Sequence, residues 1–403
     1  MWIYRSASLC PPATAIRCVE LGAALLLGSD RKIFIFQTIV CCMCLTCILS
    51  DIVLFVCRKI NQPFGIYNIR TLFLLIGWRD IGGLRQESQS FRWQRGGHGM
   101  HISRYVTFDA HVHVMSRSRL ESGWRWLQQQ CHDDVRTTGK PPTPKSLMAD
   151  LAGSGIQGCF NFFFAIFPRT SRVVNEWNDR FCSGNAGVLP FLTLHPHDTS
   201  GERSEMLNEF ILNRHFAGVK IHSFIQDIRL DAEWMHDVCA FLAKNRRILY
   251  LHTGFSATYR NRYHEEEMAR DLATLLSAFP GLTVVAAHMF YPRLDLAFRL
   301  LNTFPNLYLD TTGLISTLEK GGDVGRWLPS WEEHAERIMF GSDAGLNPAS
   351  ILEEVRLFEE LAMSEQALRR IGGETAWRLV EILGLSRDGM KLPLSPANIA
   401  KSA

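Results

Sequence analysis

Residues 108–114 of the chain read FDAHVHV, with two histidines one residue apart in a mostly apolar run. Because side chains alternate between the two faces of a β-strand, we expect His111 and His113 on one face, together with Asp109. A buried strand face normally carries Val, Ile or Leu, so imidazole rings there need polar partners. Metal ligation is one way to supply them, and a strand whose histidines bond only to protein groups is the alternative.

Seven further apolar runs follow this strand, each followed by a longer connecting segment. The eight runs cover residues 105–114, 155–167, 188–196, 216–224, 247–254, 282–290, 306–314 and 337–346. Helical patterns lie between or after them, at 204–214, 231–245, 266–280, 292–305, 351–362 and 364–383. Strands that alternate with helices predict parallel βα units, and nearly continuous apolar strands predict a sheet covered on both faces.

Eight such units within residues 104–385 predict a (β/α)8 TIM barrel, a fold whose usual length is about 250 residues. A doubly wound open sheet is the structural alternative, and the even count of eight favours closure. The connection between the first two strands is long and includes TTGKPPTPK at 137–145. Loops after barrel strands build active sites, so this connection is a candidate lid or substrate wall.

Polar residues fall at the same place in several of these units, near the end of the strand. They are His111 and His113 in the first unit, Lys220 and His222 in the fourth, His252 in the fifth, His288 in the sixth and Asp343 in the eighth. In a barrel these positions converge on one axial site. One histidine alone fits a core or loop residue, but five strand ends in register predict a shared site.

The motifs DAHVHV, GVKIH, LHTG, AAHM and GSDAG, in this order, resemble the metal-dependent amidohydrolase superfamily. The resemblance is to its amidohydrolase-related branch, which includes aminocarboxymuconate-semialdehyde decarboxylase-like enzymes, and it covers about Tyr105 to Leu385. It implies that His111, His113, His252 and Asp343 ligate the metal and that His288 handles the metal-bound water. The segments MFYP after His288 and Ala-Gly after Asp343 depart from the family pattern and leave the substrate open.

Three imidazoles and one carboxylate suit one divalent metal, Zn²⁺ first, with Mn²⁺, Fe²⁺ or Co²⁺ also compatible. Such an ion lowers the pKa of bound water toward about 7, and Asp343 or His288 would then manage the proton. Some superfamily members carry a carboxylated lysine at the position of Lys220 that bridges two metals. The GVKIH pattern resembles the branch with one metal, and His222 is then a substrate contact or a neighbour of the ligands.

The leading hypothesis is a metal-dependent hydrolase that uses a metal-activated water on a C–N or C–O bond of a small cyclic or carboxylated substrate. The alternative is a metal-dependent non-oxidative decarboxylase of an aromatic or unsaturated acid, which needs a cationic clamp for a second carboxylate. Four arginines that follow strands are candidates for that clamp: Arg169, Arg260, Arg262 and Arg293. A hydratase and a non-catalytic binding protein are further alternatives, and the presence of every expected ligand argues against the latter.

The resemblance implies a small-molecule substrate as the partner. A formal net charge of +3 over 403 residues gives no support for nucleic acid, and a homo-oligomer is left open. Seven of the eleven cysteines lie within residues 1–57 and the other four are scattered singly, which suits free thiols in a reducing, cytoplasmic compartment.

Residues 1–103 form an N-terminal extension unlike the rest of the chain. Its apolar run at 33–57 reaches the minimum length of a membrane span, but Asp51 interrupts the run and basic residues flank both ends. We expect a non-native or disordered extension, with Met100 as the true start, in preference to a membrane anchor through 33–57. Residues 386–403 are polar and patternless, which predicts a loose C-terminal tail.

Overall fold

A computed structural model of the chain describes residues 19–25, 34–40, 102–130, 141–259, 263–347 and 349–385. The chain divides into two units, Met1–Trp93 and Gln94–Ala403. In the first unit, β1 (Val19–Leu25) pairs antiparallel with β2 (Phe34–Val40), so the start of the predicted apolar run is a strand. The rest of that run, the segment 137–140 and the tail 386–403 lie outside the described residues. Of the helices that the structure describes, none is long and apolar enough to cross a bilayer.

The second unit contains a sheet of eight parallel strands whose spatial order follows the chain order. The strands are β3 (Phe108–Val112), β4 (Gly158–Asn161), β5 (Val188–Thr193), β6 (Gly218–Ile221), β7 (Ile248–His252), β8 (Thr283–Ala287), β9 (Leu307–Asp310) and β10 (Ile338–Met339). The residues after β10 run beside β3, with a bridge between Val112 and Ala344 and a hydrogen bond from the Ala110 amide to the Phe340 carbonyl. This seam closes the sheet, so the barrel is confirmed and the doubly wound alternative is excluded.

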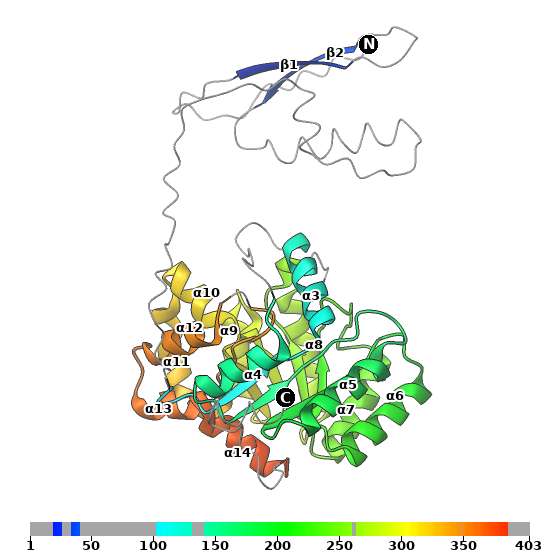
Figure 1. Ribbon diagram of the computed structural model, residues 1–403, viewed down its shortest axis with the longest axis vertical. Helices are drawn as coiled ribbons and strands as arrows, with labels where there is room; N and C mark the ends of the chain where they lie inside the picture. Colours follow the sequence, from blue (N-terminus) through cyan, green and yellow to red (C-terminus); the bar gives the residue numbers. More distant parts are fainter. Residues whose placement is uncertain are drawn as a thin grey trace. The chain divides into compact units, whose positions relative to one another are not determined.

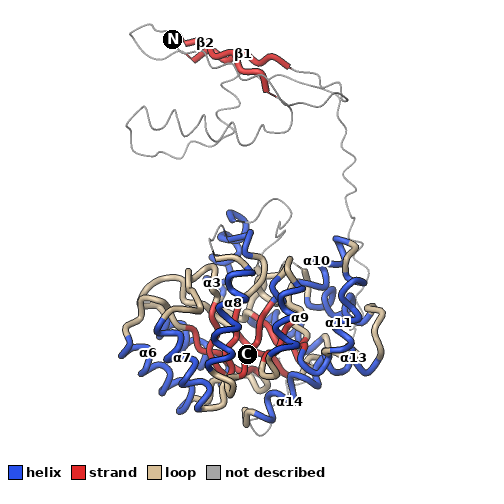
Figure 2. The backbone as a smooth tube through the Cα atoms, turned by 180° about the vertical axis from the view of Figure 1, so that it is seen from behind, coloured by secondary structure: helices blue, strands red, loops and turns tan. Residues whose placement is uncertain are grey.

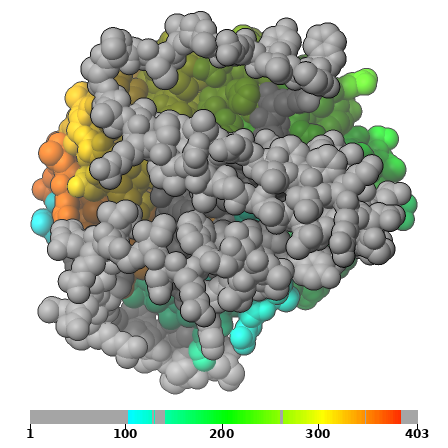
Figure 3. Space-filling view, turned by 90° about the horizontal axis from the view of Figure 1, so that it is seen from above, coloured from blue at the N-terminus to red at the C-terminus, as the bar shows by residue number. Residues whose placement is uncertain are grey.

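Helices surround the strands (Figures 1 and 2). They are α3 (Arg117–Gln130), α4 (Pro144–Gly153), α5 (Ser171–Ser183), α6 (Ser200–Met206), α7 (Glu233–Lys244), α8 (Glu265–Ala278), α9 (Leu294–Thr303), α10 (Leu314–Gly321), α11 (Val324–Glu333), α12 (Ile351–Glu359), α13 (Glu365–Arg369) and α14 (Thr375–Ile382). All six predicted helical segments are helical, with a π-helical turn in two of them, Leu207–Asn213 and Arg370–Glu374. Figure 3 shows the later helices, in yellow to orange, on the side of the barrel opposite the green ones.

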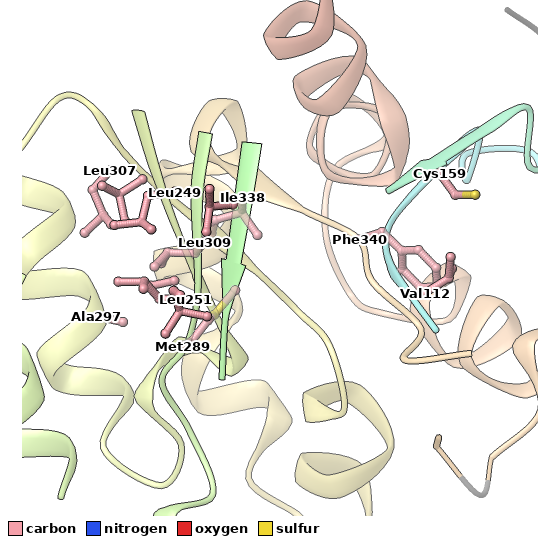
Figure 4. Close-up of a cluster of buried hydrophobic side chains, with 14 of the residues drawn as sticks. Val112, Cys159, Leu249, Leu251, Met289, Ala297, Leu307, Leu309, Ile338 and Phe340 are labelled. Atoms are coloured by element: carbon pink, nitrogen blue, oxygen red, sulfur yellow. The ribbon is translucent and has the colours of Figure 1, made fainter. Parts of the chain in front are cut away.

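Alternation along the strands divides the core into two layers. Leu249 and Leu251 of β7 face the helices, together with Leu307 and Leu309 of β9 (Figure 4). Their neighbour Tyr250 faces the barrel interior, where it packs with Phe160, Phe162 and Phe191. Ala376, Leu379 and Val380 of α14 join this inner layer, so α14 covers the end of the barrel at which the strands begin. The opposite end, where the strands finish, carries the polar residues.

The first strand departs from strict alternation. Its register against β4 pairs Asp109 with Cys159 but Val112 with Asn161, so β3 has one extra residue between the pairs, a β-bulge. His111 and His113 both face the site, but Asp109 does not accompany them. It accepts hydrogen bonds from the Ser342 hydroxyl at 2.5 Å and the His111 amide at 3.0 Å. The prediction that all three side chains share one face is therefore wrong for Asp109.

Candidate metal centre

The closing seam of the barrel brings the last strand's carboxylate to the first strand's histidines. The Asp343 amide donates to the His111 carbonyl at 2.9 Å, and the His113 amide donates to the Ala344 carbonyl at 2.8 Å. As a result, Asp343 Oδ1 lies 3.1 Å from His113 Nε2 and 3.8 Å from His111 Nε2. One ligand atom from each of these three side chains lies within 4.8 Å of the other two, a spacing that suits one metal ion.

Hydrogen bonds fix which ring nitrogen of each histidine carries the proton. His113 Nδ1 lies 3.1 Å from the Phe162 carbonyl, His252 Nε2 lies 3.0 Å from the Gly254 carbonyl, and His288 Nδ1 lies 2.8 Å from the Thr312 carbonyl. A carbonyl only accepts, so each of these nitrogens is the donor. His111 follows the same rule, because its Nδ1 lies 2.9 Å from the Asp310 carboxylate. In the neutral rings, the second nitrogen of all four carries a lone pair.

Three of these four lone pairs face another lone pair, in two close contacts. His252 Nδ1 lies 3.0 Å from His288 Nε2, and His113 Nε2 lies 3.1 Å from the Asp343 carboxylate. With the tautomers above, a proton or a metal ion is needed between the members of each pair. Imidazole and carboxylate ligands backed by such hydrogen bonds are the donor set of Zn²⁺ and related divalent ions. The residues therefore fit the predicted metal. The cluster of three does not include the fourth predicted ligand, His252, which contacts His288, and the His288 ring lies 5.2 Å from that of His111 between centroids.

Burial keeps four histidines of the site in the neutral form, in which a ring nitrogen can ligate a metal. It lowers the pKa of His111 to about 3, with the Lys220 charge adding to the effect, and it lowers the pKa of His288. The pKa values of His222 and His252 fall well below the ordinary value for the same reason. Burial opposes ionisation of Asp343, but the neighbouring His113 ring holds the pKa of Asp343 below its usual range.

Lys220 is fully buried at the end of β6. Its Nζ lies 3.3 Å from His111 Nε2 and sits over the rings of Phe162 and Tyr250, 4.5 and 4.7 Å from their centroids. Burial lowers the pKa of Lys220 to about 7. The sequence placed this lysine beside the ligands, and the structure does so too. That the site binds one metal ion, without a second ion bridged by Lys220, stays a prediction.

The remaining predicted residues divide into two groups. His222 joins the site, because its ring stacks on that of His252 at 3.7 Å between centroids. Arg169 is exposed in the loop after β4. Arg293 is held by Asp295 in two hydrogen bonds of 2.8 and 2.9 Å and by Glu266. Within the part of the chain that the structure describes, neither arginine contacts a histidine of the site, so the structure gives no support to these two as the carboxylate clamp. The other two candidates, Arg260 and Arg262, lie outside the described residues.

Sequence reasoning missed two features of the site. Asp310, the last residue of β9, is a buried carboxylate bonded to His111. Like the predicted residues, Asp310 stands at the end of a strand, so its position in the sequence could have identified it as part of the site. His288 and Asp343 adopt left-handed backbone conformations, with φ of 63° and 60°. Such conformations are uncommon outside glycine and concentrate at functional sites.

Comparison with known proteins agrees with this fold. A family model described as amidohydrolase matches residues 108–382. A search of curated proteins finds no match. An uncharacterised TIM-barrel protein from Bordetella bronchiseptica shares 18% identity and a TM-score of 0.54, over 70% of this chain and 99% of that chain.

A second solved structure is a dihydroxybenzoic acid decarboxylase from Polaromonas sp. JS666, with bound manganese and the inhibitor 2-nitroresorcinol. It shares 15% identity and a TM-score of 0.50, over 70% of this chain and 98% of that chain. At such identities the likeness concerns the fold, whereas the family model spans about two thirds of the chain and includes every histidine of the site. The protein therefore belongs to the amidohydrolase family.

Proposed function

We propose that the protein is a metal-dependent non-oxidative decarboxylase of an aromatic or unsaturated carboxylic acid. The observation that carries the proposal is a lining of aromatic rings against the histidines. Phe164 lies 5.4 Å from His113, and Tyr259 lies 5.0 Å from His222 and 5.5 Å from His252, measured between ring centroids. Aromatic walls bind a planar ring through stacked and edge-to-face contacts.

The connection between the first two strands contributes to this lining, in line with the predicted substrate wall. Trp126 of α3 stacks on Tyr259 with 5.8 Å between centroids and 17° between planes. Tyr259 in turn stacks on Phe224 at 5.6 Å and 23°. A row of rings thus runs from α3 to the ligand histidines, which favours an unsaturated substrate over a polar one.

His111, His113, His252 and Asp343 would hold one divalent ion, Zn²⁺ or Mn²⁺. When bound, the ion supplies Lewis acidity that neutralises an anionic oxygen of the substrate. His222 is suited to bind a second oxygen. Its Nδ1 accepts from the Ile225 amide at 3.3 Å, so the neutral ring carries its proton on Nε2 and can donate it in a hydrogen bond.

Decarboxylation breaks a carbon–carbon bond, releases carbon dioxide and requires a proton at the carbon left behind. Because the Thr312 carbonyl holds the Nδ1 proton of His288, the Nε2 lone pair would first take up a proton from solvent and then deliver it to that carbon. Asp343 is the second candidate proton carrier. The Polaromonas relative, a decarboxylase that binds manganese, agrees with this proposal. The hydrolase hypothesis is the second candidate, because the same ligands can activate water, but the aromatic lining gives it less support.

The test is a substrate screen on protein loaded with Mn²⁺ or Zn²⁺. Hydroxybenzoic acids and unsaturated dicarboxylic acids are assayed for release of carbon dioxide, with lactones and cyclic amides assayed for hydrolysis in parallel. We expect carbon dioxide release, with one deuterium at the reacting carbon in D2O. His288→Ala should abolish turnover with metal still bound, and His236→Ala, on the exposed side of α7, should not. Hydrolysis of a lactone or amide without any decarboxylation would refute the proposal.

A further inference from the structure

We infer that Asp310 is a positioning residue that fixes the metal-binding tautomer of His111 and the backbone turn of His288. This inference deepens the proposed function and rests on it. Asp310 lies at the end of β9 and is fully buried. Its two carboxylate oxygens serve different partners.

Oδ2 faces the first strand. It lies 2.9 Å from His111 Nδ1 and 2.6 Å from the Tyr250 hydroxyl. An ionised carboxylate only accepts, so His111 carries its proton on Nδ1 and presents the Nε2 lone pair to the site. An independent contact agrees, because Lys220 Nζ, which is a donor, lies 3.3 Å from that same Nε2. Two neighbours of different chemistry therefore require one tautomer.

Oδ1 faces the turn after β8. It accepts from the His288 amide at 2.9 Å and from the Thr312 amide at 3.1 Å. His288, Met289 and Phe290 are three successive residues with positive φ, at 63°, 45° and 56°. None of them is glycine, so the surrounding structure must hold this turn. Asp310 accepts the hydrogen bond of the first amide in this turn, that of His288, and the Thr312 carbonyl lies 2.8 Å from His288 Nδ1.

A neutral amide cannot replace this carboxylate. The side-chain amide of Asp310→Asn can take two orientations. With its NH2 group toward His111, that group would face the proton on His111 Nδ1. With its NH2 group toward the turn, it would face the backbone N–H groups of His288 and Thr312. The first arrangement favours the His111 tautomer with its proton on Nε2, which cannot ligate a metal there. Loss of a hydrogen-bond partner behind a ligating histidine typically weakens metal binding by about 10- to 100-fold.

Tyr250→Phe is the matched control. It removes the other donor to Oδ2 but leaves the contacts of Asp310 with His111 and His288 in place. The Tyr250 hydroxyl also lies 2.8 Å from the Ala110 carbonyl, so its single proton is shared between two acceptors. We expect Tyr250→Phe to change metal affinity by no more than about threefold, below the range for a direct partner of a ligand.

The experiment measures the dissociation constant of Mn²⁺ by competition with a chelator, in the full-length wild-type protein and both variants, with circular dichroism to confirm folding. Asp310→Asn should raise the dissociation constant about 10- to 100-fold. The visible spectrum of bound Co²⁺ should also change in this variant and stay unaltered in Tyr250→Phe. Wild-type affinity in folded Asp310→Asn would overturn the inference alone. No metal binding by the wild-type protein would overturn the proposed function and, with it, the inference.

A second measurement needs no folded variant of Asp310. Long-range ¹H–¹⁵N spectra of the metal-free wild-type protein report the tautomer of each histidine, and His111→Gln identifies the His111 signals. We expect His111 in the Nδ1–H form. The Nε2–H form would overturn the inference, because the carboxylate would then have no donor at His111.

Discussion

At the residue scale, the site is defined by which nitrogen of each histidine is already occupied. Four rings bond to acceptors through one nitrogen and present the other to the site, and His222 does the opposite. The sequence cannot show this distinction, because it depends on carbonyl groups from distant strands. Strand-end position alone therefore predicted five histidines in one site but could not separate the four that present a lone pair from the one that presents an N–H group.

The first prediction concerns Asp343. Asparagine tolerates the left-handed φ of 60° at this position, so Asp343→Asn should fold normally. It removes the negative charge 3.1 Å from His113, and we expect it to weaken Zn²⁺ binding by at least about 100-fold, the upper end of the effect of an indirect partner. Isothermal titration of the metal-free protein measures this. Asp231→Asn, in an exposed ion pair with Arg229, is the control and should bind as the wild type does. Equal binding by both variants would remove Asp343 from the ligand set.

The second prediction is a pH dependence of stability. The folded protein protonates His111 only near pH 3, whereas the unfolded chain does so near 6.5. Between these values the unfolded state binds more protons, so the metal-free protein loses stability as pH falls, by up to about 1.4 kcal/mol per pH unit for each such group. The lowered pKa values of His222, His252 and His288 act in the same direction.

Urea unfolding of the metal-free protein at pH 7.5, 6.5 and 5.5 measures this slope. His111→Gln removes one of the titrating groups and should reduce the slope by up to about 1.4 kcal/mol per pH unit. Phe162→Leu, in the same core, should lower stability without altering the slope. If His111→Gln keeps the wild-type slope, His111 does not titrate as described.

At the element scale, apolar runs predicted the strands because each one is buried on both faces and carries few polar residues. The bulge in β3 was not predictable in this way, because it depends on how β3 meets β4 and the segment after β10. The same limit applies to the left-handed turn at His288, which rests on Asp310 from the next strand. Side-chain type marks where a strand ends, but the backbone path beyond that end is set by its neighbours.

Gly341, between β10 and Asp343, shows such a neighbour effect and gives the third prediction. A Cβ at this position would collide with Thr312 Oγ1 and approach the His111 Cβ to 3.0 Å. Gly341→Ala should therefore lower the free energy of unfolding by about 1–3 kcal/mol, the usual effect of overpacking. Thr312→Ala removes the colliding oxygen, which has no hydrogen-bond partner among the described residues, so the double variant should recover about 1 kcal/mol. Thr312→Val keeps an atom in that place and should give no recovery. Equal recovery in both double variants would show that Thr312 is not the obstacle.

At the scale of the whole molecule, the candidate metal centre spans the seam that closes the barrel. The last strand has only two residues in the sheet, and its continuation meets β3 through a few hydrogen bonds. His111 and His113 belong to one side of this seam and Asp343 to the other. An ion held by all three would therefore join the first and last strands directly, in addition to any catalytic role.

The last prediction follows from this cross-link. An ion that binds only the folded barrel stabilises it by about 2.7 kcal/mol at a free concentration 100 times its dissociation constant. Because the ligands come from both sides of the seam between the first and last strands, we expect the full gain in global unfolding. It should appear as one cooperative urea transition that shifts upward when Mn²⁺ is added to the metal-free protein. His113→Ala should show no shift and Asp231→Asn the full shift. A shift of equal size in His113→Ala would place the ion elsewhere, and a shift confined to part of the transition would mean that the seam opens independently of the rest of the barrel.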